Sequence, residues 1–197
     1  MKKLVAIIAM LFTITAVVAQ NYDNERIFSL KIHNNISKIS ADVVGYPAIG
    51  LGLELNYQKS LSDSHPFYLE TGLGYNSTSL VNPLTALDKE SSELVFNTIN
   101  IPIAINYKFF VGDATIYPSM GFSYQYHMCE IEEDRNGYYY HENIEIPDLS
   151  FRAGITGEFH QHFVISYSYE SSILFQFSLE EYKTSLTTHM ISLGYRF

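Results

Sequence analysis

The residues best suited to chemistry are the seven histidines, which share the chain with many serines and 21 acidic residues. A Ser–His–acid set at a membrane surface could transfer or hydrolyse a lipid acyl group, with His127, His141 or His189 as the base. The chain has neither a His-x-Ser pair nor a Gly-x-Ser-x-Gly nucleophile elbow. A chance serine and histidine set is expected at this composition, so we predict no catalytic residues and no enzyme.

The acidic segment Glu130–Glu145 holds six carboxylates and is flanked or joined by His127 and His141. Its spacing departs from that of an EF-hand loop, so we predict a solvated acidic loop with no metal and no cofactor, weak Ca²⁺ binding being the alternative. The same segment contains Tyr138, Tyr139 and Tyr140. Exposed aromatic residues among polar ones could contact an extracellular protein or a glycan, and the alternative is that these tyrosines pack on one another.

The charge and cysteine content narrow the class of protein. A formal net charge of −9 and a pI of about 5.1 argue against nucleic-acid binding, which requires a basic surface. The single cysteine, Cys129, allows no intramolecular disulfide, and it lies beside acidic residues that work against thiol reactivity. A length of 197 residues is compatible with one domain.

The N-terminus has the pattern of a secretory signal peptide. Two lysines precede a continuous apolar run, and small residues stand at Val17 and Ala19. We therefore predict a signal peptide over residues 1–19, cleaved after Ala19, and a single barrel domain over residues 20–197. No cysteine follows the cleavage site, which disfavours a lipoprotein.

The elements that would position any site are strands, because apolar residues recur at every second position along the rest of the chain. The expected strands are 27–33, 49–58, 67–76, 94–109, 116–127, 149–156, 163–170 and 187–197. Long connections at Asn34–Tyr46, Ser77–Glu93, Cys129–Pro147 and Ser171–Thr184 alternate with short ones at Lys59–Pro66, Phe110–Ala114 and His160–His162. Asn136-Gly137 could turn the third long connection into an extended hairpin.

This pattern predicts an all-β fold, an eight-stranded antiparallel transmembrane up-and-down β-barrel with long extracellular loops. Pro102 and Pro118 lie inside expected strands, where we expect bulges to accommodate them. A soluble periplasmic barrel that holds a ligand is a further reading, and it would require the apolar Ile99–Ile105 face to point inward.

If the aliphatic face meets lipid, the opposite face points into the barrel and carries four acids and four bases. They are Lys31, Glu54, Glu70, Lys108, Arg152, Glu158, Glu170 and Arg196. Buried charges are tolerated when they are paired and hydrogen-bonded, and eight strands enclose just enough room for side chains. We therefore expect a lumen plugged by a charge network, the alternative being that some of these residues are solvated at strand ends.

The last eleven residues, Thr187–Phe197, form an alternating strand that ends on an aromatic residue. Leu193, Tyr195 and Phe197 share its apolar face. Tyr195-Arg196-Phe197 resembles the C-terminal signal that the outer-membrane assembly machinery reads.

Several segments together resemble an outer-membrane β-barrel family of Bacteroidota, which includes PorT-like proteins, and more generally the eight-stranded OmpX-type barrel. They are I-G-L-G-L-E-L-N-Y, F-Y-L-E-T-G-L-G-Y, I-N-I-P-I-A-I-N-Y-K-F, Y-P-S-M-G-F-S-Y, F-R-A-G-I-T-G-E-F and L-G-Y-R-F. The resemblance implies location in the outer membrane of a Gram-negative cell and no shared catalytic chemistry.

The function expected from these observations is that of a small, non-catalytic outer-membrane barrel, structural or partner-binding through its acidic loops. Its partners would be outer-membrane lipid and lipopolysaccharide, the barrel-assembly machinery, and an extracellular protein or glycan. The alternative function is a lipid-modifying barrel enzyme or a small barrel accessory to transport or secretion.

Overall fold

The computed structural model describes residues 26–41, 44–61, 66–81, 92–135, 138–160, 162–174 and 184–197. The predicted signal peptide lies outside these residues. All regular structure within them is β-strand: β1 Arg26–Ala41, β2 Val44–Ser60, β3 Phe67–Val81, β4 Ser92–Tyr107, β5 Phe109–Val111, β6 Ala114–Arg135, β7 Tyr138–Phe159, β8 Phe163–Ser172 and β9 Thr184–Arg196. In this described part of the chain, no helix is long and apolar enough to cross a membrane.

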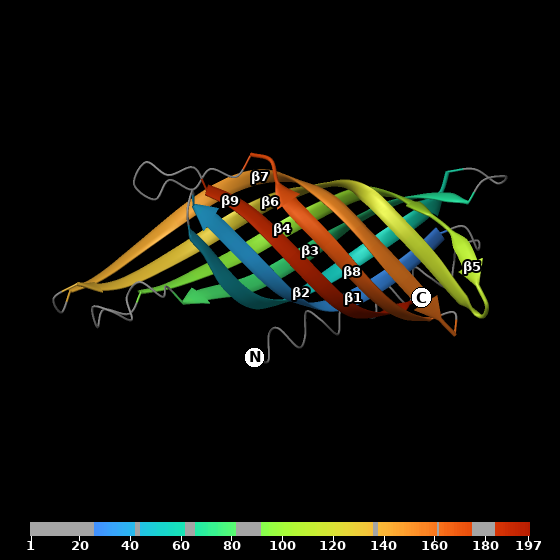
Figure 1. Ribbon diagram of the computed structural model, residues 1–197, viewed down its shortest axis with the longest axis horizontal. Coiled ribbons are helices and arrows are strands. Elements are labelled where there is room, and N and C mark those ends of the chain that lie inside the picture. Colours follow the sequence, from blue (N-terminus) through green and yellow to red (C-terminus); the bar gives the residue numbers. More distant parts are fainter. Residues whose placement is uncertain are drawn as a thin grey trace.

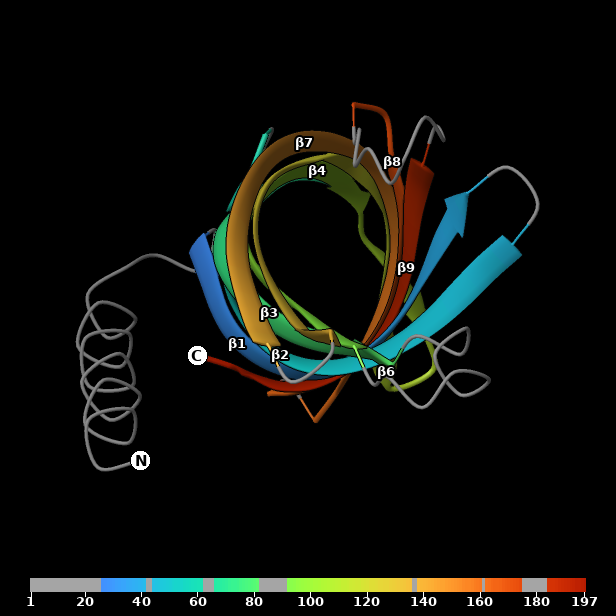
Figure 2. The same ribbon diagram turned by 90° about the vertical axis from the view of Figure 1, so that its left-hand side faces the viewer.

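The strands form one closed antiparallel barrel, in which neighbours in the chain are neighbours in the sheet (Figure 1). The first strand pairs with the last, β1 with β9, and Figure 2 shows the strands encircling a single axis. The short β5 continues the course of β4, and both pair with β6. The barrel therefore has eight strand positions, which confirms the predicted fold class.

Alternation along each strand separates two chemically opposite faces. On β4, Ile101, Ile103 and Ile105 are exposed on the outer surface, whereas Asn100 and Asn106 are buried in the interior. A soluble barrel would bury the isoleucines and expose the asparagines. The arrangement is the one expected of a barrel in lipid, with apolar side chains outward and polar ones inward, and it rules out the soluble reading with an inward-facing Ile99–Ile105 face.

Three of the long connections predicted from the sequence are shorter than expected. Most of Asn34–Tyr46 belongs to β1 and β2, which are joined by residues 42–43. Parts of Ser77–Glu93 belong to β3 and β4, and Cys129–Pro147 is a continuous β6–β7 hairpin with Arg135 paired to Tyr138. The error has a physical cause. Polar composition was taken as a loop signal, but in this barrel alternate polar residues such as Asn35 and Ser37 are buried in the lumen.

The prolines are accommodated without the expected bulges. The β3–β4 ladder skips from Thr71↔Ile103 to Gly74↔Asn100, so the interruption falls at Pro102 while the register is unchanged. The β4–β6 ladder ends at Asn106↔Ser119 and resumes in β5 at Phe109↔Ile116, around Pro118. Proline lacks the N–H that a ladder requires, so Pro118 accounts for the break between β4 and β5.

Candidate functional site in the barrel interior

Arg152 on β7 is the centre of a buried charge network in the lumen. Its Nη1 donates to Glu54 Oε2 at 2.7 Å and its Nη2 to Glu54 Oε1 at 2.9 Å. Arg152 Nη1 also lies 3.5 Å from Glu170 Oε1 on the adjacent strand β8. All three side chains are buried. The paired hydrogen bonds between a guanidinium and a carboxylate give this contact both strength and a fixed geometry.

A second ion pair lies beside this one. Lys31 Nζ on β1 is 3.7 Å from Glu70 Oε1 on β3. Glu70 Oε2 also accepts hydrogen bonds from Gln58 and from Asn106, the latter at 2.7 Å. Such neutral donors complete the solvation of a carboxylate that has left water.

Glu54 is surrounded in the same way. Asn56 Nδ2 donates to its Oε1 at 2.7 Å and Asn100 Nδ2 donates to its Oε2 at 3.3 Å. Glycines on neighbouring strands make room for these side chains, because a Cβ on Gly74 would stand 2.1 Å from Asn100 Oδ1. The small residues of the inward face are thus needed where long polar side chains lie flat against the wall.

Near the end that carries the C-terminus, Arg196 forms a separate cluster. It pairs with Glu158 and donates to Tyr117 Oη at 2.7 Å. Tyr117 Oη in turn donates to Glu158 Oε2 at 2.9 Å, and the guanidinium of Arg196 lies 4.5 Å from the Tyr117 ring centre. Arg196 Nη2 also donates to Gln58 Oε1 at 3.0 Å. Because Gln58 donates to Glu70 as well, it links the two clusters.

Lys108 is the one residue of the eight predicted lumen charges that lies apart from both clusters. It stands at the β4–β5 break, half-buried, with Nζ 5.8 Å from the Tyr68 ring centre and 5.3 Å from that of Phe110. Its backbone N–H donates to Pro66 O at 2.7 Å. Alternation alone placed Lys108 on the inner face, but the strand ends there and the side chain reaches the aromatic rim.

Neutral and histidine side chains extend the network toward the other end of the barrel. His33 hydrogen-bonds Asn76, and Thr98 Oγ1 lies 2.8 Å from His127 Nδ1. His127 Nε2 is 3.9 Å from Asp148 Oδ2.

Asp148 has its own set of donors. It accepts hydrogen bonds from Ser150, from Ser172 and from the backbone N–H of Leu174. Sequence reasoning missed Asp148, His33 and the bridging amides because it selected charged residues from the expected strands. Their period-two spacing on the inward face was the signal that could have found them.

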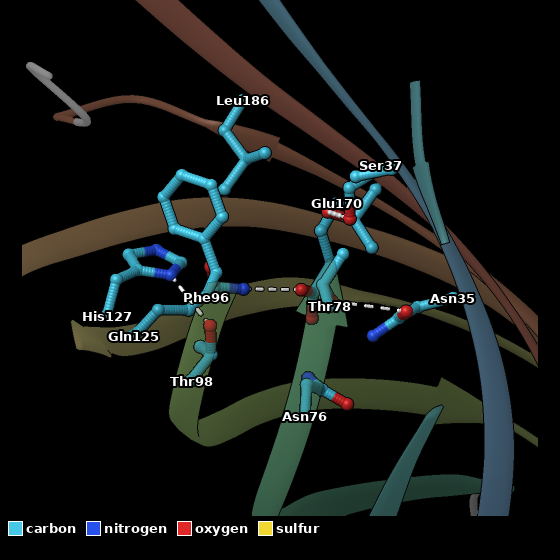
Figure 3. A pocket seen from close by; sticks show the side chains of 12 residues that line it. Asn35, Ser37, Asn76, Thr78, Phe96, Thr98, Gln125, His127, Glu170 and Leu186 are labelled. Atoms are coloured by element: carbon cyan, nitrogen blue, oxygen red, sulfur yellow. Dashed lines mark hydrogen bonds between the residues drawn. The ribbon is translucent and has the colours of Figure 1, made fainter. Parts of the chain in front are cut away.

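A small cavity lies in this half of the lumen, as Figure 3 shows from close by. Its volume is about 30 Å³, enough for about two water molecules. Amide, hydroxyl and imidazole groups form most of its wall, together with one carboxylate, that of Glu170, and two large apolar side chains, those of Phe96 and Leu186. The interior between the cavity and Arg196 is occupied by side chains.

The other predicted site residues lie elsewhere. Leu193 and Tyr195 are exposed on the outer face of β9, and Phe197 N donates to Phe28 O at 2.9 Å where the barrel closes. Tyr138, Tyr139 and Tyr140 belong to β7, but their side chains are outside the described part of the structure. Among the residues that are described, no group of three His, Cys, Asp or Glu side chains is placed to hold a metal ion.

Comparison with known proteins agrees with this architecture. The family described as outer membrane protein beta-barrel domain matches residues 6–197. The chain therefore belongs to this family of outer-membrane barrels. A search among curated proteins found no match.

Solved structures with the same fold include Ail, the attachment invasion locus protein of Yersinia pestis, in complex with the heparin analogue sucrose octasulfate. It is 17% identical, with a TM-score of 0.58, and the match covers 88% of this chain and 99% of Ail. A major outer membrane protein of Thermus thermophilus is 12% identical, with a TM-score of 0.55 and coverage of 87% and 99%. OprG of Pseudomonas aeruginosa is 13% identical, with a TM-score of 0.51 and coverage of 90% and 98%.

Proposed function

We propose that this protein is a non-catalytic outer-membrane barrel that holds an acidic β-hairpin at the cell surface for a protein partner, while its lumen is closed by the charge network around Arg152. Residues 1–19 direct export and are removed. Leu193, Tyr195 and Phe197 form the signal for the assembly machinery. The segments quoted above support a relationship with the PorT-like barrels of Bacteroidota.

The observation that carries the surface role is the free edge of the β6–β7 hairpin. Pairing between β7 and β8 ends at Ser150↔Ser172, but β7 begins at Tyr138. Residues 138–148 have β6 as their only ladder partner among the described strands, and they span about 35 Å of strand. In Figure 1 this hairpin extends beyond the other strands, at the end opposite β5. An unpaired edge offers backbone donors and acceptors to an added strand.

The charge of the hairpin indicates the chemistry of the partner. Residues 129–147 contain six acidic residues and one basic residue, a formal charge of 1 − 6 = −5. Ail was crystallised with a sulfated sugar, but an anionic glycan would be repelled by this hairpin. An extended segment rich in lysine or arginine fits both the free edge and the charge.

A shortened hairpin tests this role. Removing residues 131–134 and 139–142 deletes four ladder pairs and four acids, and it keeps Arg135-Asn136-Gly137-Tyr138 as the tip. The probe is a ten-residue peptide of alternating lysine and valine, measured by fluorescence anisotropy on the purified barrel in micelles. We expect the shortened variant to bind at least about tenfold more weakly than the wild type, because the added strand loses its template.

Two controls separate strand pairing from simple charge attraction. The full-length variant with Glu132→Gln, Glu133→Gln, Asp134→Asn and Glu142→Gln retains the edge, so it should keep binding with a weaker salt dependence. A peptide of the same charge with proline at every third position cannot complete a ladder. Equal binding of the two peptides by the wild type, or undiminished binding by the shortened barrel, would contradict the proposal.

A further inference from the structure

The layer of the lumen around Arg152 has unequal numbers of opposite charges. Three buried carboxylates, those of Glu54, Glu70 and Glu170, face two buried cations, those of Lys31 and Arg152. The sum is 2 − 3 = −1. The Arg196–Glu158 pair is balanced in its own cluster, and Asp148 is held by three donors of its own. A net charge inside a barrel is unfavourable unless a counter-charge lies close to it.

The unbalanced charge falls on Glu170. Arg152 gives both of its terminal nitrogens to Glu54 at hydrogen-bond distance, and its contact with Glu170 is the longer one at 3.5 Å. Glu170 Oε2 accepts a hydrogen bond from Gln125, but Oε1 accepts none from the described residues. Glu170 is 3% exposed. It is therefore a buried carboxylate with one oxygen not saturated by donors.

The cavity described above lies against this carboxylate (Figure 3). Glu170 is the only carboxylate among its lining residues, whose other polar groups are neutral. Amide and hydroxyl oxygens come from Asn35, Asn76, Gln125, Thr78, Thr98 and Thr188. A single carboxylate with several neutral oxygens in a space of this size suits one small monovalent cation, whereas Ca²⁺ sites commonly use several carboxylates.

We propose that the cavity beside Glu170 binds a sodium ion, which supplies the missing positive charge of the lumen. The groups that face Glu170 are Arg152 on β7 and Gln125 on β6, with His127 in the same cavity wall. A proton on Glu170, His33 or His127 would supply the same charge. The test must therefore distinguish sodium from protons.

The experiment follows thermal unfolding of the whole barrel in a neutral detergent at fixed pH and fixed chloride concentration. Sodium is exchanged stepwise for N-methyl-D-glucamine, a cation too large for the cavity. We expect the unfolding midpoint of the wild type to rise with sodium and then to level off in the manner of single-site binding. Glu170→Gln should remove this dependence, because it removes the charge and keeps the shape. Glu145→Gln, an exposed acid on β7, should leave it unchanged.

Direct binding is measured by broadening of the sodium-23 NMR signal on addition of the wild-type barrel, so the proposal stays testable if Glu170→Gln does not assemble. Broadening that lithium, but not N-methyl-D-glucamine, reverses would support the site. The proposal is wrong if the midpoint responds to pH and not to sodium, because protons then balance the charge. It is equally wrong if Glu170→Gln retains the sodium response or if no broadening occurs.

Discussion

Arg152 and Glu54 form an ion pair with two hydrogen bonds, at 2.7 and 2.9 Å, that spans the lumen from β7 to β2. In the order of the barrel these strands are four positions apart out of eight, so the pair joins opposite walls. Glu54 is 1% exposed. The pair therefore determines both how the lumen is filled and how the two halves of the barrel are held in register.

Replacing Arg152 should be among the most destabilising changes in the interior. Arg152→Met leaves Glu54 and Glu170 buried without their cation, which costs on the order of 3–5 kcal/mol of unfolding free energy. Lys108→Met is the matched control, because Lys108 forms no ion pair with the described residues and should cost less than about 1 kcal/mol. Urea unfolding in detergent micelles, followed by far-ultraviolet circular dichroism, measures both. Similar losses for the two variants would contradict the role assigned to Arg152.

Gly121 is expected to tolerate no side chain. A Cβ at this position would lie 2.1 Å from Ile103 O and 2.6 Å from Ala104 Cα, both backbone atoms of the neighbouring strand. Gly121→Ala should therefore destabilise the barrel by about 1–3 kcal/mol or prevent closure between β4 and β6. Gly157→Ala is the comparison, because its Cβ meets only side-chain atoms, the closest at 3.2 Å. Equal unfolding midpoints for the two variants would show that the sheet spacing at Gly121 is wider than described.

The alternation of apolar residues predicted the barrel because lipid outside and polar side chains inside impose the same period of two on every strand. It placed Glu54 and Arg152 on one face. It could not predict that they meet, since a contact between opposite walls depends on the register of all the strands between them. Pro118 illustrates a second limit. Its position was visible in the sequence, but its effect, the break between β4 and β5, depends on which strand edge its missing N–H faces.

The C-terminal residues are predicted to act in assembly more than in stability. Phe197→Ala should slow conversion to the folded form in cells, seen as loss of the boiling-dependent mobility shift in pulse-labelled outer membranes. The purified variant should refold into micelles like the wild type, because Phe197 joins the barrel through its backbone N–H. Phe163→Ala, an exposed aromatic residue outside the C-terminal strand, is the control. A parallel defect in cells and in refolding would make Phe197 a stability residue instead.

The predicted signal peptide has a direct readout in the mass of the mature protein. Cleavage after Ala19 removes two lysines and leaves a chain that begins at Gln20, with a formal charge of −9 − 2 = −11. Intact mass spectrometry of the outer-membrane form should give the mass of residues 20–197. Retention of residues 1–19 in the membrane-inserted protein would contradict this prediction.

The measurement that tests the plugged lumen most directly is conductance across a planar lipid bilayer. We predict that the wild-type barrel inserts without discrete current steps, because the network of Arg152, Glu54, Glu70 and Arg196 fills the space that eight strands enclose. The double variant Glu54→Ala/Arg152→Ala, provided that it retains the mobility shift of a closed barrel, should admit small ion currents. Stable ion-conducting steps from the unmodified protein would contradict the account, since they would require a continuous water path past these side chains.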